Sequence, residues 1–193
     1  MGGGDSAGRT PRRSAGESRA AILAAAERIA ARRGSGHLSI EAVAAEAGLS
    51  KGGVLYHFPS KMRMLEALVE LHVARTEEAL ARHRADAGDA APNALARALI
   101  AAFRERRDAT PQNATGLFAA LAENPDFIDP ARSFQADLVA RLRADSDDPE
   151  LAVIVFLCME GLQSLRLFGS ECLDEAGTEA ALRRLSALLD GAG

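Results

Sequence analysis

The sequence predicts an all-α protein, and three features lead to that prediction. Alanine, the residue with the highest helix propensity, is abundant throughout the chain. Apolar residues recur at helical spacing in several segments, whereas β-branched residues are scattered, and their longest run lies in a stretch with helix-ending residues. Serine, proline and glycine stand where those segments begin and end.

The first 17 residues are rich in glycine, serine and arginine and lack apolar periodicity, so we expect a disordered basic tail over residues 1–17. This stretch has no apolar core of the kind that a signal peptide requires. A helix is predicted from Ser18 onward. Its apolar side carries Ile22, Leu23, Ala26, Ile29 and Ala30.

Residues 38–61 predict two short helices separated by a glycine turn. Ser39 is placed to cap a first helix, and Gly48 ends it because glycine enters the left-handed conformation at low cost. Leu49 fills the corner, and Ser50 caps the second helix. The apolar face of the first helix consists of Ile40, Val43, Ala44 and Ala47. This layout is that of a helix-turn-helix that reads DNA, although a small helical bundle can contain the same pair of helices for structural reasons alone.

The second short helix and the residue that begins the next one supply most of the polar groups expected to meet DNA. The candidate DNA-binding residues are Ser39, Ser50, Lys51, Gly52, Gly53, Tyr56, His57 and Lys61. We expect Lys61 and Tyr56 at the phosphate backbone, and Lys51 and His57 near base edges. The two glycines leave room for the backbone to approach the DNA closely.

The string AAEAGLSKGGVLYHFPSK resembles the turn, the recognition helix and the start of the following helix in the TetR family of transcriptional repressors. The resemblance covers about Ser18 to Leu71 at motif level, and the rest of the chain is similar to the family in length and helicity. It implies an N-terminal three-helix helix-turn-helix head joined to a C-terminal helical ligand-binding and dimerisation domain. We therefore expect a DNA-binding domain over residues 18–60 and a ligand-binding and dimerisation domain over residues 61–193.

The charge of the chain is unevenly distributed, which fits this division. The net charge is −4, yet residues 1–75 carry 11 Lys/Arg and 7 Asp/Glu, net +4, and the remainder carries 12 and 20, net −8. A basic head can meet phosphate while an acidic body avoids it. The arginines of the tail, Arg9, Arg12 and Arg13, are either solvated or form an arm that adds phosphate or minor-groove contacts.

A long helix is predicted from Lys61 to about His83. Its inward face is expected to carry Met62, Leu65, Leu68, Val69 and His72. Lys61 at its start is suited to phosphate binding, since a helix N-terminus carries a partial positive charge. After a break near residues 85–92, further helices are predicted around 95–103, from Pro111, around 134–142 and from Pro149, which Asp148 precedes as a cap.

The helix from Pro149 contains nine apolar residues in a row, LAVIVFLCM, so it must be covered on all sides. The run is too short to span a membrane, because Glu160 follows it directly. We expect one face to pack within the domain and another, including Gly161, Leu165 and Phe168, to meet a second copy of the chain. The leucines of the last helix, which complete this homodimer interface, are Leu182, Leu185, Leu188 and Leu189.

An effector pocket is predicted where the middle helices face the helix from Pro149. The candidate ligand-binding residues are Phe103, Phe118, Leu121, Phe134, Glu160 and Gln163. The alternative is a core filled by these side chains. A carboxylate on so apolar a helix needs a partner, and Arg166, a residue of the second copy, or a polar or cationic ligand could provide one for Glu160.

The sequence carries no recognisable catalytic or cofactor motif, and His72 and His83 are too far apart along one helix to share a metal. Cys158 and Cys172 lack metal-ligand spacing, and Cys158 is expected to be buried. The resemblance to the TetR family implies a cytoplasmic, ligand-responsive regulator that binds a near-palindromic operator in double-stranded DNA as a homodimer, and that an unknown small molecule releases. A thiol-based redox sensor and a helical enzyme or carrier are the alternatives.

Overall fold

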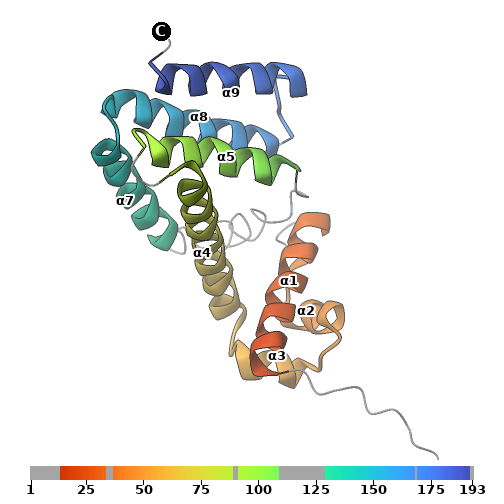
Figure 1. Cartoon of the computed structure of the whole chain (residues 1–193). Coiled ribbons are helices and arrows are strands. Elements are labelled where there is room, and N and C mark those ends of the chain that lie inside the picture. The colour runs from red at the N-terminus through yellow and green to blue at the C-terminus, as the bar shows by residue number, and fades with distance from the viewer. Residues whose placement is uncertain (1–13, 34–36, 89–90, 109–128, 168, 192–193) are drawn as a thin grey trace, which may run out of the picture.

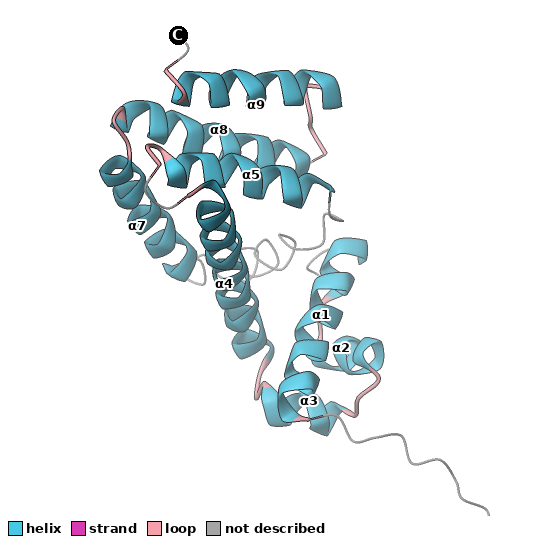
Figure 2. Cartoon of the chain, in the orientation of Figure 1, coloured by secondary structure: helices cyan, strands magenta, loops and turns pink. Residues whose placement is uncertain are grey.

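The computed structural model describes residues 14–33, 37–88, 91–108, 129–167 and 169–191, and within these ranges it contains helices and no strand (Figures 1 and 2). The all-α prediction is confirmed. The helices are α1 (Ala15–Arg33), α2 (Ile40–Ala47), α3 (Lys51–His57), α4 (Lys61–Ala87), α5 (Ala94–Asp108), α7 (Asp129–Asp145), α8 (Pro149–Leu167) and α9 (Glu175–Leu189). The predicted helix from Pro111 and the arginines of the tail lie outside the described residues.

Helix α1 begins at Ala15, inside the stretch that the sequence was expected to leave as a tail. Ser14 and Glu17 form a capping box: the Ser14 amide donates to Glu17 Oε2 at 2.6 Å, and the Glu17 amide donates to Ser14 Oγ at 3.2 Å. The signal was present as Ser-x-x-Glu, but apolar periodicity begins only later. The expectation of disorder was therefore wrong for residues 14–17.

Two hydrophobic cores organise the chain, and α4 contributes to both. The first, which we call the head, joins α1, α2 and α3 with the first half of α4 around Ile22, Val54, Met64 and Leu65. The second, which we call the body, joins the last part of α4 with α5, α7, α8 and α9 around Leu80, Phe103 and other buried residues. Figure 1 shows α4 as the long element that runs from the head at the bottom to the body at the top.

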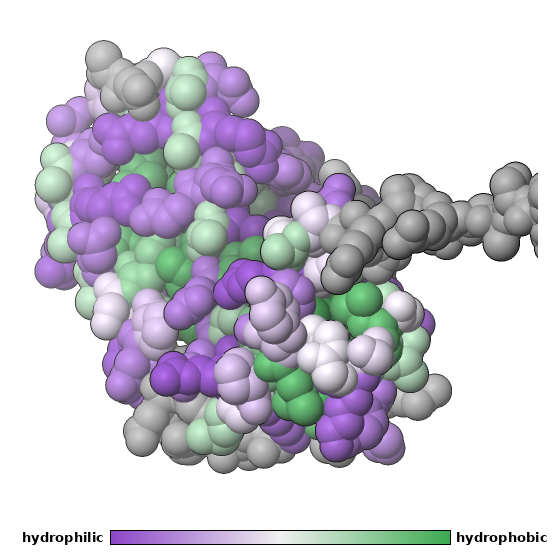
Figure 3. Space-filling model, turned by 90° about the horizontal axis from the view of Figure 1, so that it is seen from below, coloured by the Kyte–Doolittle hydropathy of each residue, from purple (hydrophilic) through white to green (hydrophobic). Residues whose placement is uncertain are grey.

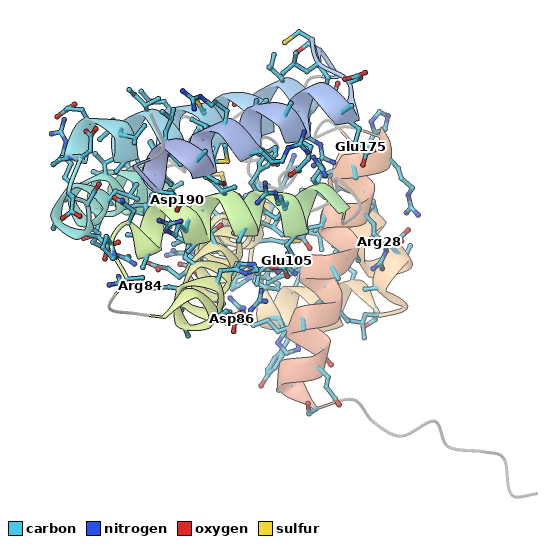
Figure 4. The ribbon with its side chains drawn as sticks, turned by 45° about the horizontal axis from the view of Figure 1, so that its top comes forward. Arg28, Arg84, Asp86, Glu105, Glu175 and Asp190 are labelled. Carbon is cyan, nitrogen blue, oxygen red and sulfur yellow. The ribbon has the colours of Figure 1, made fainter. Side chains whose placement is uncertain are left out.

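Polar contacts fix α4 against its neighbours along the body. Arg141 of α7 donates to Glu77 Oε1 at 2.7 Å, and His83 Nε2 lies 2.7 Å from Glu105 Oε2 of α5. Near its end, Arg84, which is labelled in Figure 4, donates to Asp145 Oδ1 at 2.9 Å. These pairs join α4 to α5 and α7, so a shift of α4 must rearrange several contacts at once.

The predicted inward face of α4 holds except at Met62. Leu65, Leu68 and Val69 are buried, but the Met62 side chain is 47% exposed, and Met64 is buried instead. Helical spacing does not reveal whether a neighbouring helix extends far enough to cover the first turn. The assignment of Met62 to the core was therefore wrong.

Candidate DNA-binding surface and ligand cavity

The turn between α2 and α3 has the geometry that the sequence predicts. Ser39 Oγ accepts a hydrogen bond from the Ala42 amide at 3.1 Å and so caps α2. Gly48 has φ +68°, and the Leu49 amide donates to the Ala44 carbonyl at 2.9 Å. A side chain at Gly48 would be strained in this left-handed conformation. Glycine therefore both ends α2 and sets the angle at which α3 leaves it.

Helix α3 has a buried side and an exposed side. Val54 is fully buried and Phe58 is 3% exposed, with the Arg19 guanidinium 5.2 Å from the centre of the Phe58 ring. Tyr56, in contrast, is 80% exposed. A helix of seven residues is not stable alone, so the packing of Val54 and Phe58 holds α3 in place. The side chains on its other side are left available to a partner.

The predicted DNA-binding residues gather at the α3 end of the head. Lys51 forms an exposed ion pair with Glu41 of α2 at 2.7 Å, and the Tyr56 and His57 rings make an edge-to-face contact at 5.1 Å. Ser50 Oγ accepts from the Gly53 amide at 3.0 Å, and Lys61 is half-buried at the start of α4. Seen from this end, hydrophilic residues surround small apolar patches (Figure 3).

The acidic groups of α2 are held by cations. Arg28 Nε donates to Glu46 Oε1 at 2.8 Å and Arg32 donates to Glu46 Oε2 at 2.6 Å; these hydrogen bonds lower the pKa of Glu46 (Figure 4). The hydrogen bond from Lys51 likewise lowers the pKa of Glu41. Each carboxylate is thus paired, which limits the repulsion that α2 would exert on a nearby phosphate.

A partly buried ion pair connects the head to the middle of α4. Arg75 Nη1 lies 2.6 Å from Glu27 Oε1 of α1, and the Glu27 residue is only 6% exposed. A buried carboxylate needs a partner of this kind. In addition to the apolar contacts of the head, this ion pair therefore helps to fix the position of α1 relative to α4.

The body contains a cavity of about 100 Å³ between α4, α5, α7 and α8. The predicted ligand-binding residues Phe134, Glu160 and Gln163 line it, as do His72 and Thr76 of α4. Phe118 and Leu121 lie outside the described residues. The prediction that Phe103 joins this cavity was wrong: Phe103 is fully buried in the core, and it borders a different groove.

That second groove has a volume of about 380 Å³ and lies between α5, α8 and the segment that leads into α9. Phe103, Leu162 and Leu165 form its apolar side, and Asp174 and Glu175 lie at its polar side. Helical spacing placed Phe103 on the correct helix and on its buried face. Helical spacing could not show whether Phe103 borders the cavity or the groove, because both lie beside the core of the body.

Arg106 is among the polar residues of the cavity that the sequence analysis missed. Arg106 lines the cavity, and burial lowers its pKa although Glu160 and Glu105 oppose the shift. Burial also raises the pKa of Glu160, which Arg106 and a 3.1 Å hydrogen bond from Gln135 oppose. A signal for Arg106 was available, because it continues the apolar stripe of Leu99 and Phe103 at helical spacing.

The partner of Glu160 is thus Gln135, with Arg106 nearby. Arg166, one of the partners considered from the sequence, donates instead to the Arg107 carbonyl oxygen at 3.1 Å. Glu160 lines the cavity: its carboxylate is desolvated enough to raise its pKa, while part of its side chain is exposed to solvent.

Helix α8 leaves an apolar face uncovered in the single chain. Ile154 is 50% exposed and Leu157 is 60% exposed, and Gly161 continues the same face one turn later. Leu182 and Leu189 of α9 were expected at an interface between copies, but both are buried against the chain's own core. That part of the prediction was wrong, and Phe168 lies outside the described residues.

Cys158 was expected to be buried, but it is half-buried beside the core of the body, and Cys172 is exposed. Both thiols are free. Within the described ranges, no group of His, Cys, Asp and Glu side chains is arranged to hold a metal ion. Of the helices in those ranges, none has the length and apolar character needed to cross a bilayer.

Family models of known proteins match both the head and the body of the chain. Residues 22–68 match the family model of bacterial regulatory proteins of the tetR family, and residues 93–190 match that of the tetracyclin repressor-like C-terminal domain. The chain belongs to the TetR family. The second match covers about half of the chain and includes α5 to α9, so the resemblance seen in the helix-turn-helix extends into the body.

Solved structures show the same TetR fold. A transcriptional regulator from Rhodococcus sp. Rha1 is 23% identical with a TM-score of 0.70, covering 90% of this chain and 96% of that one. A TetR-family member from Streptomyces coelicolor A3 is 24% identical with a TM-score of 0.63, covering 88% and 98%. The multidrug binding protein EbrR complexed with ethidium is 25% identical with a TM-score of 0.63, covering 88% and 98%. No curated protein matches the sequence.

Proposed function

We propose that this TetR-family chain is a homodimeric repressor that binds a near-palindromic operator and is released by a small molecule. The observation that carries the proposal is the course of α4: its first half packs in the head, while His72 and Thr76 of the same helix line the cavity. A ligand in the cavity would contact the helix that positions α3. A DNA-binding role of this kind belongs to the bacterial cytoplasm, where the chromosome lies.

The predicted DNA-binding residues support the first part of the proposal. The exposed ring of Tyr56 and the half-buried Lys61 would position the phosphate backbone, and Lys51 and His57 would reach base edges. Lys51 must exchange its partner Glu41 for DNA. Because that pair is exposed, breaking it costs little.

The uncovered face of α8 supports the proposed homodimer. Ile154 and Leu157 would pack against the same residues of a second copy about a two-fold axis. Two heads would then read two half-sites about one helical turn of DNA apart, roughly 34–36 Å.

Release follows from linkage between the two sites. A ligand weakens operator binding only if it binds the DNA-free arrangement of the heads more tightly than the DNA-bound one. Because EbrR, a multidrug binding protein, has the same fold, a ligand site in the body fits the proposal.

Sequencing the fragments of genomic DNA that the purified protein retains is the primary test. We expect a shared inverted repeat among them. Fragments without a common motif, or no retention at low salt, would contradict the proposal.

A glycine variant tests the placement of α3. An added Cβ at Gly52 meets only Ser50 Oγ, at 4.0 Å, so Gly52→Leu should fold normally and still block close approach to DNA. We expect about a 100-fold loss of operator affinity, the equivalent of two factors of ten in Kd. Gly53 is less suitable because its Cβ would lie 3.3 Å from Ser50 Oγ and disturb the cap.

The matched control is Ala144→Leu, which adds the same side chain at an exposed position of α7. It should leave operator affinity unchanged. Normal binding by a folded Gly52→Leu protein would show that α3 does not face the DNA.

A further inference from the structure

The inner wall of the cavity carries two polar atoms with unmet hydrogen-bonding capacity. Arg106 Nη1 and Gln163 Oε1 are buried, and in the part of the chain that the structure describes neither has a hydrogen-bond partner. Buried polar atoms in folded proteins are almost always paired, because an unpaired one loses its interaction with water and gains nothing in return. Two such atoms on one cavity wall indicate a place where a ligand supplies the partner.

The charges around the cavity favour an anion over a cation. Part of the Glu160 side chain is exposed to solvent, and its carboxylate already accepts a hydrogen bond from Gln135. Arg106 is less exposed, and its Nη1 has no hydrogen-bond partner among the described residues. Of these two charged groups, Arg106 therefore has the unpaired atom, and an acceptor placed at Nη1 would satisfy it.

Gln163 can serve the same ligand group. A 180° rotation of its terminal amide exchanges the oxygen and the NH₂ group at the same place, so the side chain can donate as well as accept. A carboxylate in the cavity would then accept from the guanidinium of Arg106 and from the amide of Gln163. The two donors would come from α5 and α8.

The remaining walls and the volume limit the body of the ligand. Phe134, Phe156 and Met159 give the cavity apolar surface, and its volume is about 100 Å³. That is less than the roughly 150 Å³ of a cavity that accommodates benzene. An aliphatic chain of about four carbons is smaller than benzene and fits these limits when its carboxylate lies at the polar atoms of Arg106 and Gln163.

We propose that the cavity binds a small aliphatic monocarboxylate, held by Arg106 and Gln163 with its apolar chain against Phe134, Phe156 and Met159. This inference rests on the proposed function, because it names the chemical class of the effector. It also distinguishes the protein from EbrR, whose structures contain ethidium and malachite green. A large cationic dye would exceed the volume and would meet the positive charge of Arg106.

Three probes that share an isobutyl group and differ in charge test the inference on the full-length protein. They are 3-methylbutanoate, 3-methylbutanamide and 3-methylbutylamine, with binding measured by calorimetry and by the shift in unfolding temperature at constant ionic strength. We expect the carboxylate to bind tightest, the amide about tenfold more weakly, and the amine and ethidium not to bind. Tighter binding of the amine than of the carboxylate would overturn the inference.

Two variants assign the binding to the proposed residues. Arg106→Gln should weaken 3-methylbutanoate binding by about 10- to 100-fold, because it removes a charged donor and keeps an uncharged one. Gln163→Leu should weaken it by about fivefold to tenfold, since it removes a neutral hydrogen bond. The control, Arg143→Gln, removes an arginine that pairs with Glu150 on the exposed surface and should change nothing.

Circular dichroism and thermal unfolding establish that each variant is folded. Removing a poorly paired buried charge often preserves stability, so we expect Arg106→Gln to pass this check. A folded Arg106→Gln protein that keeps wild-type affinity for 3-methylbutanoate would refute the assignment. If that variant does not fold, the result for folded Gln163→Leu decides in the same way.

Operator binding is measured separately, in the presence and absence of 3-methylbutanoate. Arg106-dependent binding of the carboxylate supports the ligand chemistry whether or not operator affinity changes. A failure of the proposed regulatory function would instead appear as an unchanged operator affinity at saturating carboxylate, or as no DNA binding at all.

Discussion

The head and the body are both built from helices around an apolar core, but they differ in whether their polar side chains have hydrogen-bond partners. In the head, the buried Glu27 is paired with Arg75, and Glu46 accepts from two arginines. In the body, Arg106 and Gln163 face a cavity with atoms that lack partners among the described residues. Among the described residues, the buried polar groups of the head are thus paired, whereas the cavity of the body has unpaired polar atoms that the proposed ligand would satisfy.

The largest effect is expected at the uncovered face of the body. Leu157→Glu should convert the proposed dimer into monomer, because the two-fold axis places two carboxylates in one desolvated interface. Analytical ultracentrifugation at micromolar concentration measures this. Met62→Glu is the control, since Met62 is a similarly exposed apolar residue of the head and should leave assembly unchanged. A Leu157→Glu protein that still sediments as a dimer would place the interface elsewhere.

Glu27→Gln tests how much the pairing of a buried polar group stabilises the head. It leaves Arg75 without its carboxylate, and we expect the free energy of unfolding to fall by about 2 kcal/mol. Urea denaturation measures the loss. Glu66→Gln removes the exposed i,i+3 partner of Arg63 and should cost about 0.5 kcal/mol or less. An equal decrease in the free energy of unfolding in the two variants would show that the burial of Glu27 does not make its ion pair more stabilising than an exposed one.

Two glutamates should make opposite contributions to the pH dependence of stability. Burial raises the pKa of Glu160, so the unfolded chain ionises first and stability is lost as pH rises above the ordinary value of 4.5. The pKa of Glu46 is lowered by Arg28 and Arg32, so its contribution is present above that value and is lost as pH falls.

We therefore expect Glu160→Gln to raise the unfolding temperature at pH 7, and Glu46→Gln to lower it. The Glu160 difference should vanish at about pH 3, where the carboxyl is protonated in both states, whereas the Glu46 difference should shrink as pH falls and vanish only below the lowered pKa of Glu46. Thermal unfolding at the two pH values measures them. Shifts of the same sign at pH 7 would contradict the contrast between head and body.

The smallest change is expected for Lys61→Ala. It should weaken operator binding for all sequences and reduce the slope of log affinity against log salt by about one, as for the loss of one phosphate contact. Arg143→Ala, at an exposed site of the body, is the control and should not alter the slope. An unchanged slope for Lys61→Ala would remove Lys61 from the phosphate contacts.

The sequence predicted the head more closely than the body for a physical reason. Capping serines, a left-handed glycine and a short apolar face are local features, and Ser39, Gly48, Ser50 and Val54 behave as local rules require. The contents of the cavity depend on how four helices pack together. Helical periodicity placed Phe134, Glu160 and Gln163 at the cavity, where the structure has them. It could not show that Phe103 lies away from the cavity. It also could not show that Gln135 lines the cavity, because Gln135 is on the exposed side of α7 like many other polar residues.

The division of labour within α3 has a consequence for how such a protein can diversify. Val54 and Phe58 hold the helix in the fold, while Tyr56 and the exposed Lys51 and Gly52 do not contribute to the core. Under the proposed function, substitutions on the exposed side can therefore alter operator preference without a large change in stability. A duplicated copy of the gene could acquire a new target on the same scaffold, with the proposed effector cavity beside the middle of α4 left untouched.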